Sequence, residues 1–501
     1  MKNSSILKKL AGETAVYGVS TIVARFLNFL FVPLYTYTLS TEDYGVVTEF
    51  MSYIAILQVL LTMGLETGCF RLANKDGLNP ITVFSSALWS VTVVSALFLL
   101  GMLLFNKPLS AAMGYPDYRQ CYIYIGLILF SDSITSVLFA KLRFDTKAWK
   151  FAIFKVIKIF TETCSNLFLF LLFPKIAVAY PNNFLLNFVP PTPDFSYPIF
   201  SIVISAVVAL VIFIPDFIRL GFNFDSKIFK GLMRYSLPLM VAGLPGVMND
   251  FMDRVLFRFF NVDDTLWRSD LGIYQAAVKV AVIMSLFVQT FRFASEPFFF
   301  ARAKERDVRK TYAVIMEYFV AFCMLIFLGV VLYIDVLQYI VGKDFRVGMD
   351  IVPVMLISYM MMGMLFNISM WYKLSDKSSY AIYITLSGLL VTIVINVLFL
   401  PKYSYYAAAW GHFFSYLIMM IVSVLLGRKH YHIPYRWGKI IVVVMYALLL
   451  YTLSSLVPLS WPLALRLALN TILILIYIAG YLLFEKYMNK YESKNRQQVN
   501  S

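Results

Sequence analysis

The sequence predicts an all-α polytopic membrane protein, and three observations support this fold class. Of its 501 residues, 60% are hydrophobic and only 14% are charged, whereas about a quarter are charged in an ordinary soluble domain. Apolar runs long enough to cross about 30 Å of hydrocarbon recur along the chain. Lys and Arg, which give a net charge of +15, fall mostly between these runs. This pattern excludes a soluble enzyme, a secreted scaffold and a disordered chain.

Fourteen runs are long enough to be transmembrane helices. In chain order they lie at about residues 14–38, 45–68, 82–106, 120–140, 151–173, 197–215, 236–257, 271–291, 313–333, 351–371, 380–400, 405–425, 439–457 and 462–484. The first run follows Lys2, Lys8 and Lys9, as a signal peptide would, but it is too long and contains Arg25. We therefore expect it to be retained as the first helix.

The distribution of Lys and Arg predicts the orientation. An even number of spans places both termini on one side, and Lys and Arg favour the cytoplasmic side. With the termini inside, 28 of the 43 Lys and Arg residues fall in inner connections and 8 in outer ones. Both termini are therefore predicted to be cytoplasmic.

A short sequence echo indicates two related halves. Residues 39–46 (LSTEDYGV) follow the first span, and residues 270–274 (DLGIY) occupy the equivalent place after the seventh. Repeated halves are frequent in secondary transporters, whose sites lie between the repeats. The predicted domains are two six-helix lobes at 1–225 and 226–430, helices 13 and 14 at 431–485, and a cytoplasmic tail at 486–501.

Arg25 is the strongest candidate for binding an anionic substrate. It lies about three turns into the first span, too deep to reach either membrane surface easily. A charged side chain at mid-membrane costs at least about 2.5–3.5 kcal/mol, so it usually faces a water-filled cavity or a partner. The alternative is a structural ion pair with an acid such as Glu49 or Asp253.

Four further cations within spans are candidates for the wall of such a cavity. Lys155 and Lys158 share one face of the fifth span with Glu162, because the three are spaced three and four residues apart. Lys279 lies two turns into the eighth span, and Arg254 lies in the seventh. In the alternative interpretation Lys158 pairs with Glu162 and Lys155 extends to the inner surface.

Four acids within spans, Glu49, Glu66, Asp132 and Asp250, are candidate sites for a coupling H+ or Na+. No other cofactor is expected. No nucleotide-binding motif is present, and the paired histidines at 430 and 432 have no third metal ligand nearby.

Prolines and glycines in two spans mark candidate hinges. Pro33 lies in the first span, and Gly243 and Pro245 lie in the seventh. Proline removes a backbone hydrogen bond and leaves a soft point in a helix. Breaks at matching places in two halves suggest a transport path, although a static kink that improves packing would leave the same signature.

Several short motifs occur one after another along the chain, and their order is informative. They are GETAVYG at 12–18, Arg25, PLY at 33–35, LSTEDYG at 39–45, YSLPL at 235–239, Asp253-Arg254, and LGIY at 271–274. Together with fourteen spans, this order resembles that of Wzx-type polysaccharide or O-antigen flippases, which belong to the multidrug/oligosaccharidyl-lipid/polysaccharide (MOP) flippase superfamily.

The resemblance implies a flippase of the bacterial inner (cytoplasmic) membrane rather than an enzyme. Such a protein moves an undecaprenyl-pyrophosphate-linked oligosaccharide repeat unit from the cytoplasmic to the outer leaflet by alternating access, for surface polysaccharide biosynthesis. Its two lobes enclose a central cavity, and Arg25 falls where members that flip pyrophosphate lipids carry a cation. The implied partners are membrane lipids, a polysaccharide polymerase and a chain-length protein, with no nucleic acid.

Two alternatives remain open from the sequence. A MATE-like cation-coupled drug exporter would be expected to have twelve spans and an acidic cavity for cationic substrates. A membrane glycosyltransferase or polymerase that uses the same lipid carrier would be expected to have a sizeable outer loop with acidic catalytic groups.

Overall fold

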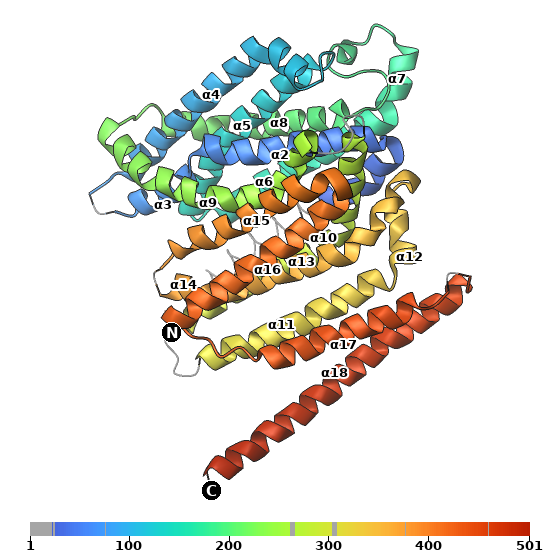
Figure 1. The fold of residues 1–501 in the computed structure, drawn as a ribbon. Helices are drawn as coiled ribbons and strands as arrows, with labels where there is room; N and C mark the ends of the chain where they lie inside the picture. Colours follow the sequence, from blue (N-terminus) through green and yellow to red (C-terminus); the bar gives the residue numbers. More distant parts are fainter. Residues whose placement is uncertain are drawn as a thin grey trace. The chain divides into compact units, whose positions relative to one another are not determined.

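The computed structural model describes residue 23 and residues 26–500, apart from 76, 261–265, 303–307, 376 and 459. Residues 26–38 are helical, and the later helices are α2 (Thr41–Thr62), α3 (Leu65–Ala73), α4 (Pro80–Ala112), α5 (Arg119–Phe144), α6 (Ala148–Leu167), η1 (Phe168–Leu172), α7 (Phe173–Ala179), η2 (Phe184–Asn187), α8 (Ser196–Leu220), α9 (Ser226–Phe260), α10 (Trp267–Ala301), α11 (Val308–Val331), α12 (Ile334–Leu337), η3 (Gln338–Ile340), η4 (Lys343–Ile351), α13 (Val352–Ile368), α14 (Met370–Leu374), α15 (Tyr380–Tyr403), α16 (Tyr405–His430), α17 (Trp437–Ser455) and α18 (Leu463–Asn500). These described segments contain no β-strand (Figure 1). The predicted all-α fold class is confirmed.

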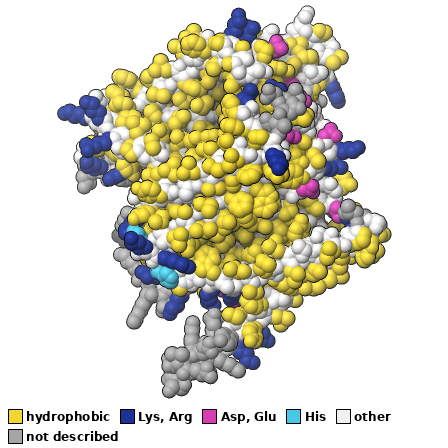
Figure 2. All heavy atoms as spheres, viewed as in Figure 1, with side chains coloured by type: hydrophobic (Ala, Val, Ile, Leu, Met, Phe, Trp, Pro, Cys, Tyr) yellow, Lys and Arg dark blue, Asp and Glu magenta, His cyan; other side chains and the backbone are white. Residues whose placement is uncertain are grey.

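Within the described residues, twelve helical segments are long and apolar enough to cross a membrane. They correspond to twelve of the fourteen predicted spans. Of the first predicted span, at 14–38, residues 14–22, 24 and 25 lie outside the described residues, and 26–38 are helical. Figure 2 shows a largely hydrophobic face, with most charged side chains at its margins, as a lipid-facing surface requires.

The seventh predicted span forms as part of the long helix α9, although it is less apolar than the others. Its polar side chains have partners inside the protein. Asn249 Oδ1 accepts a hydrogen bond from Thr392 Oγ1 (2.8 Å), and Asp253 Oδ2 accepts one from Tyr274 Oη (2.5 Å). A helix can carry buried polar groups in a membrane when neighbouring helices satisfy their hydrogen bonds.

The chain forms two compact units. The first runs to Ala276 and includes Gly388–Gly411, and the second contains Ala277–Ser387 and the chain from His412 onward. In the first unit α5 packs against α4 and α8, and α9 packs against α2, α3 and α4; in the second, α11 packs against α13, α17 and α18. The lobe boundaries expected at residues 225 and 430 stay a prediction.

The second predicted span is broken into α2 and α3 by two residues in the left-handed region. Met63 has φ 50° and Gly64 has φ 66°. After the break, α3 approaches α9 closely, because a Cβ at Gly68 would overlap the Ser236 hydroxyl and a Cβ at Gly64 would lie 2.9 Å from the Ser236 carbonyl oxygen. Small residues allow such close helix contact in membranes. This contact brings the end of α3 close to the beginning of α9.

The candidate hinge residues lie within continuous helices in this conformation. Pro245 is buried in α9, which continues through Pro238 and Gly243. A Cβ at Gly243 would meet no atom within 4 Å, and Pro33 lies within the helical residues 26–38. Their role as hinges stays a prediction.

Candidate functional site

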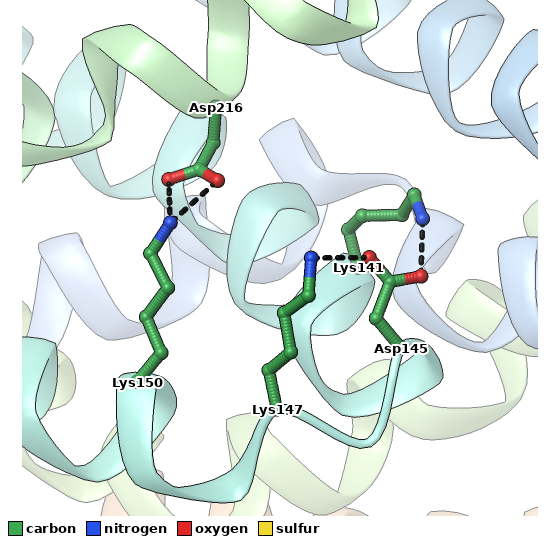
Figure 3. Close-up of polar contacts among 5 residues, drawn as sticks. All are labelled: Lys141, Asp145, Lys147, Lys150 and Asp216. Carbon is green, nitrogen blue, oxygen red and sulfur yellow. Dashed lines mark hydrogen bonds and ion pairs between the residues drawn. The ribbon is translucent and has the colours of Figure 1, made fainter.

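The cations between α5 and α6, at a predicted inner connection, are locally neutralised. Asp145 pairs with both Lys141 and Lys147, the latter at 3.4 Å. Lys150 Nζ lies 2.7 Å from each carboxylate oxygen of Asp216 on α8 (Figure 3). These side chains tie the ends of three helices together, so we expect them to stabilise the fold rather than to hold an anionic substrate.

A pocket of about 730 Å³ lies where the end of α3 meets the beginning of α9. Arg71 and Lys75 line it from α3 and the following connection, and Lys227 and Arg234 line it from α9. The Arg71 guanidinium lies 4.2 Å from the centre of the Tyr235 ring, which is also part of the lining. We call this hollow the basic pocket; its connections are predicted to be cytoplasmic.

Among the described residues, the positive charge of the basic pocket has no ion-pair partner. No carboxylate is among its described lining residues, and none of its four cations forms an ion pair with another described residue. The nearby Asp225 caps α9 by accepting hydrogen bonds from the amides of Lys227 (2.7 Å) and Ile228 (3.1 Å). Clustered cations without counter-charges attract anions, and Arg and Lys bind phosphate oxygens through charge-assisted hydrogen bonds.

At the predicted outer end of the same unit, α2 and α10 touch backbone to backbone. A Cβ at Gly45 would overlap the carbonyl oxygen of Arg268, and a Cβ at Gly272 would overlap the carbonyl oxygen of Thr41. The hydroxyls of Thr41 and Ser269 are 2.7 Å apart. The two glycines are those of the sequence echo, so the echo marks a contact between equivalent helix starts.

A buried carboxylate lies one turn further along α2. Glu49 has no exposed surface and accepts a bidentate ion pair from Arg258 of α9, with Nη2 to Oε2 at 2.9 Å and Nε to Oε1. Tyr53 Oη donates to Oε1 (2.8 Å), and Tyr115 Oη donates to Oε2 (2.7 Å). We call Glu49, Tyr53, Tyr115 and Arg258 the Glu49 cluster.

Aromatic rings enclose the cluster. The Arg258 guanidinium lies 5.2 Å from the centre of the Tyr115 ring and 4.7 Å from that of Trp267, and Arg268 contacts the same two rings. Burial, and then the Glu49 carboxylate, raise the pKa of Tyr115 well above its usual range. Tyr115 therefore stays a hydrogen-bond donor at physiological pH, which holds the connection between α4 and α5 against α2.

The structure gives the predicted basic residues different surroundings. Arg25 lies outside the described residues. Lys158 pairs with Asp132 of α5 at 2.5 Å, and Lys155 lies 5.5 Å from the centre of the Phe151 ring. Arg254 is buried, and its Nε donates to Gln275 Oε1 at 3.1 Å. Lys279 is half-buried in α10.

Ion pairs hold several of the candidate coupling acids in this conformation. Glu49 is held by Arg258, Asp132 is held by Lys158, and Glu66 lies 2.7 Å from Arg143. Asp250 is exposed on α9. An ion that bound to one of the three paired acids would have to compete with, or replace, the paired cation.

The Lys158–Asp132 pair allows a structural role to be separated from substrate binding. We expect Lys158→Met to lower the free energy of unfolding by about 1–2 kcal/mol, because it leaves the partly buried Asp132 carboxylate unpaired. Adding Asp132→Leu should restore the thermal midpoint of the detergent-purified protein. If Lys158 also binds the substrate, transport will stay low in the stable double variant. A midpoint that Lys158→Met leaves unchanged would contradict the pairing.

Sequence reasoning missed two groups of residues, the cations of the basic pocket and the partners of Glu49. Arg71 and Arg234 were visible only as members of positively charged inner connections. The available signal was the pair of small residues at 64 and 68, four apart, which predicts close helix contact. For Arg258 the sequence offered only its place near the end of a span. Among the described residues no cluster of His, Cys, Asp or Glu could hold a metal ion.

The family of sequences described as "Polysaccharide biosynthesis protein" matches residues 10–302, more than half of the chain. The chain belongs to this family. The chain is also similar to a probable low-salt glycan biosynthesis flippase of Haloferax volcanii, with 19% identity over 438 residues that cover 86% of each protein.

The fold of this polysaccharide biosynthesis family member is also similar to the folds of solved structures. The lipid II flippase MurJ in an inward closed conformation matches with a TM-score of 0.67 and 13% identity, over 92% of this chain and 98% of that one. An inward-facing multidrug resistance MATE family transporter of the MOP superfamily matches with a TM-score of 0.60 and 11% identity, over 82% and 94%. The predicted superfamily, and the prediction of a transporter rather than an enzyme, are confirmed.

Proposed function

We propose that the protein is a flippase that moves an undecaprenyl-pyrophosphate-linked oligosaccharide from the cytoplasmic to the outer leaflet of a bacterial inner membrane. Its family, and the printed names of the glycan flippase and the lipid II flippase that it resembles, support a lipid-linked glycan as cargo. The surface polysaccharide that would receive this glycan, O-antigen included, is part of the proposal.

The observation that carries the proposal is the basic pocket. A pyrophosphate linkage carries several negative charges next to the membrane surface. Four cations that have no ion-pair partner in the described part of the chain lie at a predicted cytoplasmic helix end and match that charge. Arg71 and Arg234 can each bind phosphate oxygens in a bidentate manner. A drug exporter for cationic substrates would need acidic groups at such a position, and none of the described lining residues is acidic.

The physical task explains why a protein is needed. The hydroxyls and phosphates of the head group would lose their hydrogen-bond partners in hydrocarbon, so they need a polar path, while the polyprenyl tail can stay in lipid. Alternating access requires one end to be closed while the other admits the cargo. The Glu49 cluster and the Gly45–Gly272 contact hold α2, α9 and α10 together at the predicted outer end of the first unit, and we propose that they close this end.

Further along the path, we propose that Arg25, Lys155, Lys279 and Arg254 bind the pyrophosphate in turn. For Arg254 this requires release from Gln275 and from the buried Asp253 carboxylate, whose Oδ1 lies 3.5 Å from Arg254 Nη1. The membrane potential would assist the outward step, because moving one negative charge out of a negative interior gains about 2.3 kcal/mol per 100 mV. The return of the empty carrier would then be coupled to H+ or Na+ at one of the candidate acids.

The basic pocket can be tested by removing two of its charges. We expect Arg71→Gln with Arg234→Gln to raise the KM for labelled lipid-linked oligosaccharide about thirtyfold, since each cation near the surface contributes about 1 kcal/mol to anion binding. The assay uses vesicles in which the predicted cytoplasmic face is inside, and it measures label that becomes accessible outside without chemical change.

Lys230→Gln is the matched control, because Lys230 is an exposed cation of α9 that does not line the basic pocket. It should leave the KM within about twofold of the wild-type value, as expected for a surface charge away from the site. An unchanged KM in the double variant would remove the basic pocket from substrate capture. A chemically altered product would favour an enzyme that uses the same lipid.

A further inference from the structure

The second unit contains a hollow of about 270 Å³ bordered by α13, α14, α16 and α17. Its base is rigid. The Trp371 ring packs against Gly427 so closely that a Cβ there would lie 2.9–3.1 Å from ring atoms, and Trp371 Nε1 donates a hydrogen bond to Ser423 Oγ at 3.1 Å. The hollow therefore has a fixed base, in which Trp371 of α14 packs against α16.

The opposite wall begins at Trp437, the first residue of α17. Two nearby cations hold this helix start against α11: Arg436 Nε and Lys439 Nζ each lie 2.9 Å from a carboxylate oxygen of Glu317. The helix begins without a side-chain cap, and a Cβ at Gly438 would meet no atom within 4 Å. The space beside Gly438 at this helix start is therefore open, and the positive end of the helix dipole favours an anion there.

A second, apolar hollow of about 290 Å³ continues from the first. The two share Val424, Arg428 and Trp437, and the second adds Met420, Ile421 and Leu425. Residues 420 and 428 are eight positions apart on α16, about 12 Å along the helix axis. The two adjoining hollows, which we together call the groove, thus change from a more polar lining at the end of α16 to an apolar lining two turns deeper in the span.

We propose that this groove binds an anionic phospholipid of the inner leaflet. The phosphate would lie between Arg428 and the start of α17, and an acyl chain would lie along Ile421 and Leu425. The predicted topology places the end of α16 at the cytoplasmic surface, where anionic lipids are attracted to basic residues and Trp is favoured at the interface. Figure 2 shows His side chains beside Lys and Arg side chains near this end of α16.

Charge complementarity favours a phospholipid over the proposed cargo. Among the described lining residues Arg428 is the one Lys or Arg, no carboxylate is present, and Arg428 forms no ion pair with a described residue. His432 adds a polar group at the mouth. One Arg beside a helix start suits the single charge of a phosphodiester, whereas a pyrophosphate suits the four cations of the basic pocket.

Lipid binding to the purified full-length chain tests this site without any transport assay. Native mass spectrometry in detergent should show phosphatidylglycerol bound at least about fivefold more tightly than phosphatidylcholine with the same acyl chains, because one Lys or Arg contributes about 1 kcal/mol to anionic lipid binding. Arg428→Gln should abolish this preference. Arg428→Lys should retain most of it, which would show that a loss in the glutamine variant does not reflect misfolding.

Lys429→Gln is the matched control, because it removes an adjacent exposed cation that lines neither hollow. It should leave the preference intact. Equal binding of the two lipids, or an unchanged preference in Arg428→Gln, would overturn the proposal. Displacement of phosphatidylglycerol by equimolar undecaprenyl pyrophosphate would assign the groove to the cargo, and displacement by millimolar inorganic phosphate alone would show that the acyl chain contributes nothing.

Discussion

Arg258→Gln should open the predicted outer end of the first unit. The substitution removes the only bidentate partner of Glu49 among the described residues and leaves a fully buried carboxylate with two tyrosine hydroxyls. Breaking a buried ion pair by removing one partner costs about 3–5 kcal/mol. If opening lets water reach Glu49, the open state avoids that cost, and the equilibrium should shift by more than about a hundredfold.

A disulfide between Thr41→Cys and Ser269→Cys provides the measurement. The two native hydroxyls are 2.7 Å apart, so the cysteines can approach disulfide geometry only while α2 and α10 are in contact. In a background in which Cys69, Cys121, Cys164 and Cys323 are replaced by serine, Arg258→Gln should slow cross-linking at least about tenfold. The cross-linked protein should not transport, and a reductant should restore its activity.

Two further variants make the result specific. Arg268→Gln removes a neighbouring cation that contacts the same aromatic rings but is not an ion-pair partner of Glu49, so cross-linking should stay close to the parent rate. Arg258→Lys keeps the charge but loses the bidentate geometry, and it should give an intermediate rate. Parent-like cross-linking in Arg258→Gln would show that this ion pair does not close the outer end.

The sequence was sufficient to predict where helices form, because span length and the scarcity of charge are local properties. It was not sufficient to predict how polar groups pair. Lys158 has Glu162 one turn away on its own helix, yet its ion pair is with Asp132 of α5. Glu49, considered as a partner for Arg25, pairs with Arg258, which is 209 residues away in the chain. These choices depend on which helix faces pack together, and no spacing rule within one helix encodes them.

The same reason explains why the basic pocket was not predicted from the sequence. Arg71 and Arg234 belong to separate connections, and they meet because Gly64 and Gly68 let α3 approach α9 at Ser236. The charge count correctly marked both connections as basic, but a charge count assigns a side of the membrane and not a position in space. The echo around Gly45 and Gly272 was more informative, since equivalent positions in two halves are candidates for mutual contact.

Gly45→Val should prevent the outer end from closing. A Cβ at position 45 would overlap the Arg268 carbonyl oxygen, and a backbone atom of a helix cannot move aside as a flexible side chain can. Overpacking costs about 1–3 kcal/mol or more where the backbone must shift, and separating α2 from α10 would also strain the neighbouring Glu49 cluster. We expect transport to fall more than about tenfold, and the 41–269 disulfide to form correspondingly slowly.

Because each helix contributes one glycine to the contact, a substitution on the second helix tests the same prediction. Gly272→Val should reproduce the loss, because a Cβ at Gly272 would overlap the carbonyl oxygen of Thr41 from the opposite helix. Gly101→Val is the matched control, since a Cβ at this position of α4 would meet no atom within 4 Å, and transport should stay within about twofold of wild type. Because both variants carry the same helix-propensity change, a difference between Gly45→Val and Gly101→Val isolates the contact. Wild-type transport and cross-linking by Gly45→Val would mean that α2 and α10 need not touch during the cycle, and the outer closure would then have to lie elsewhere.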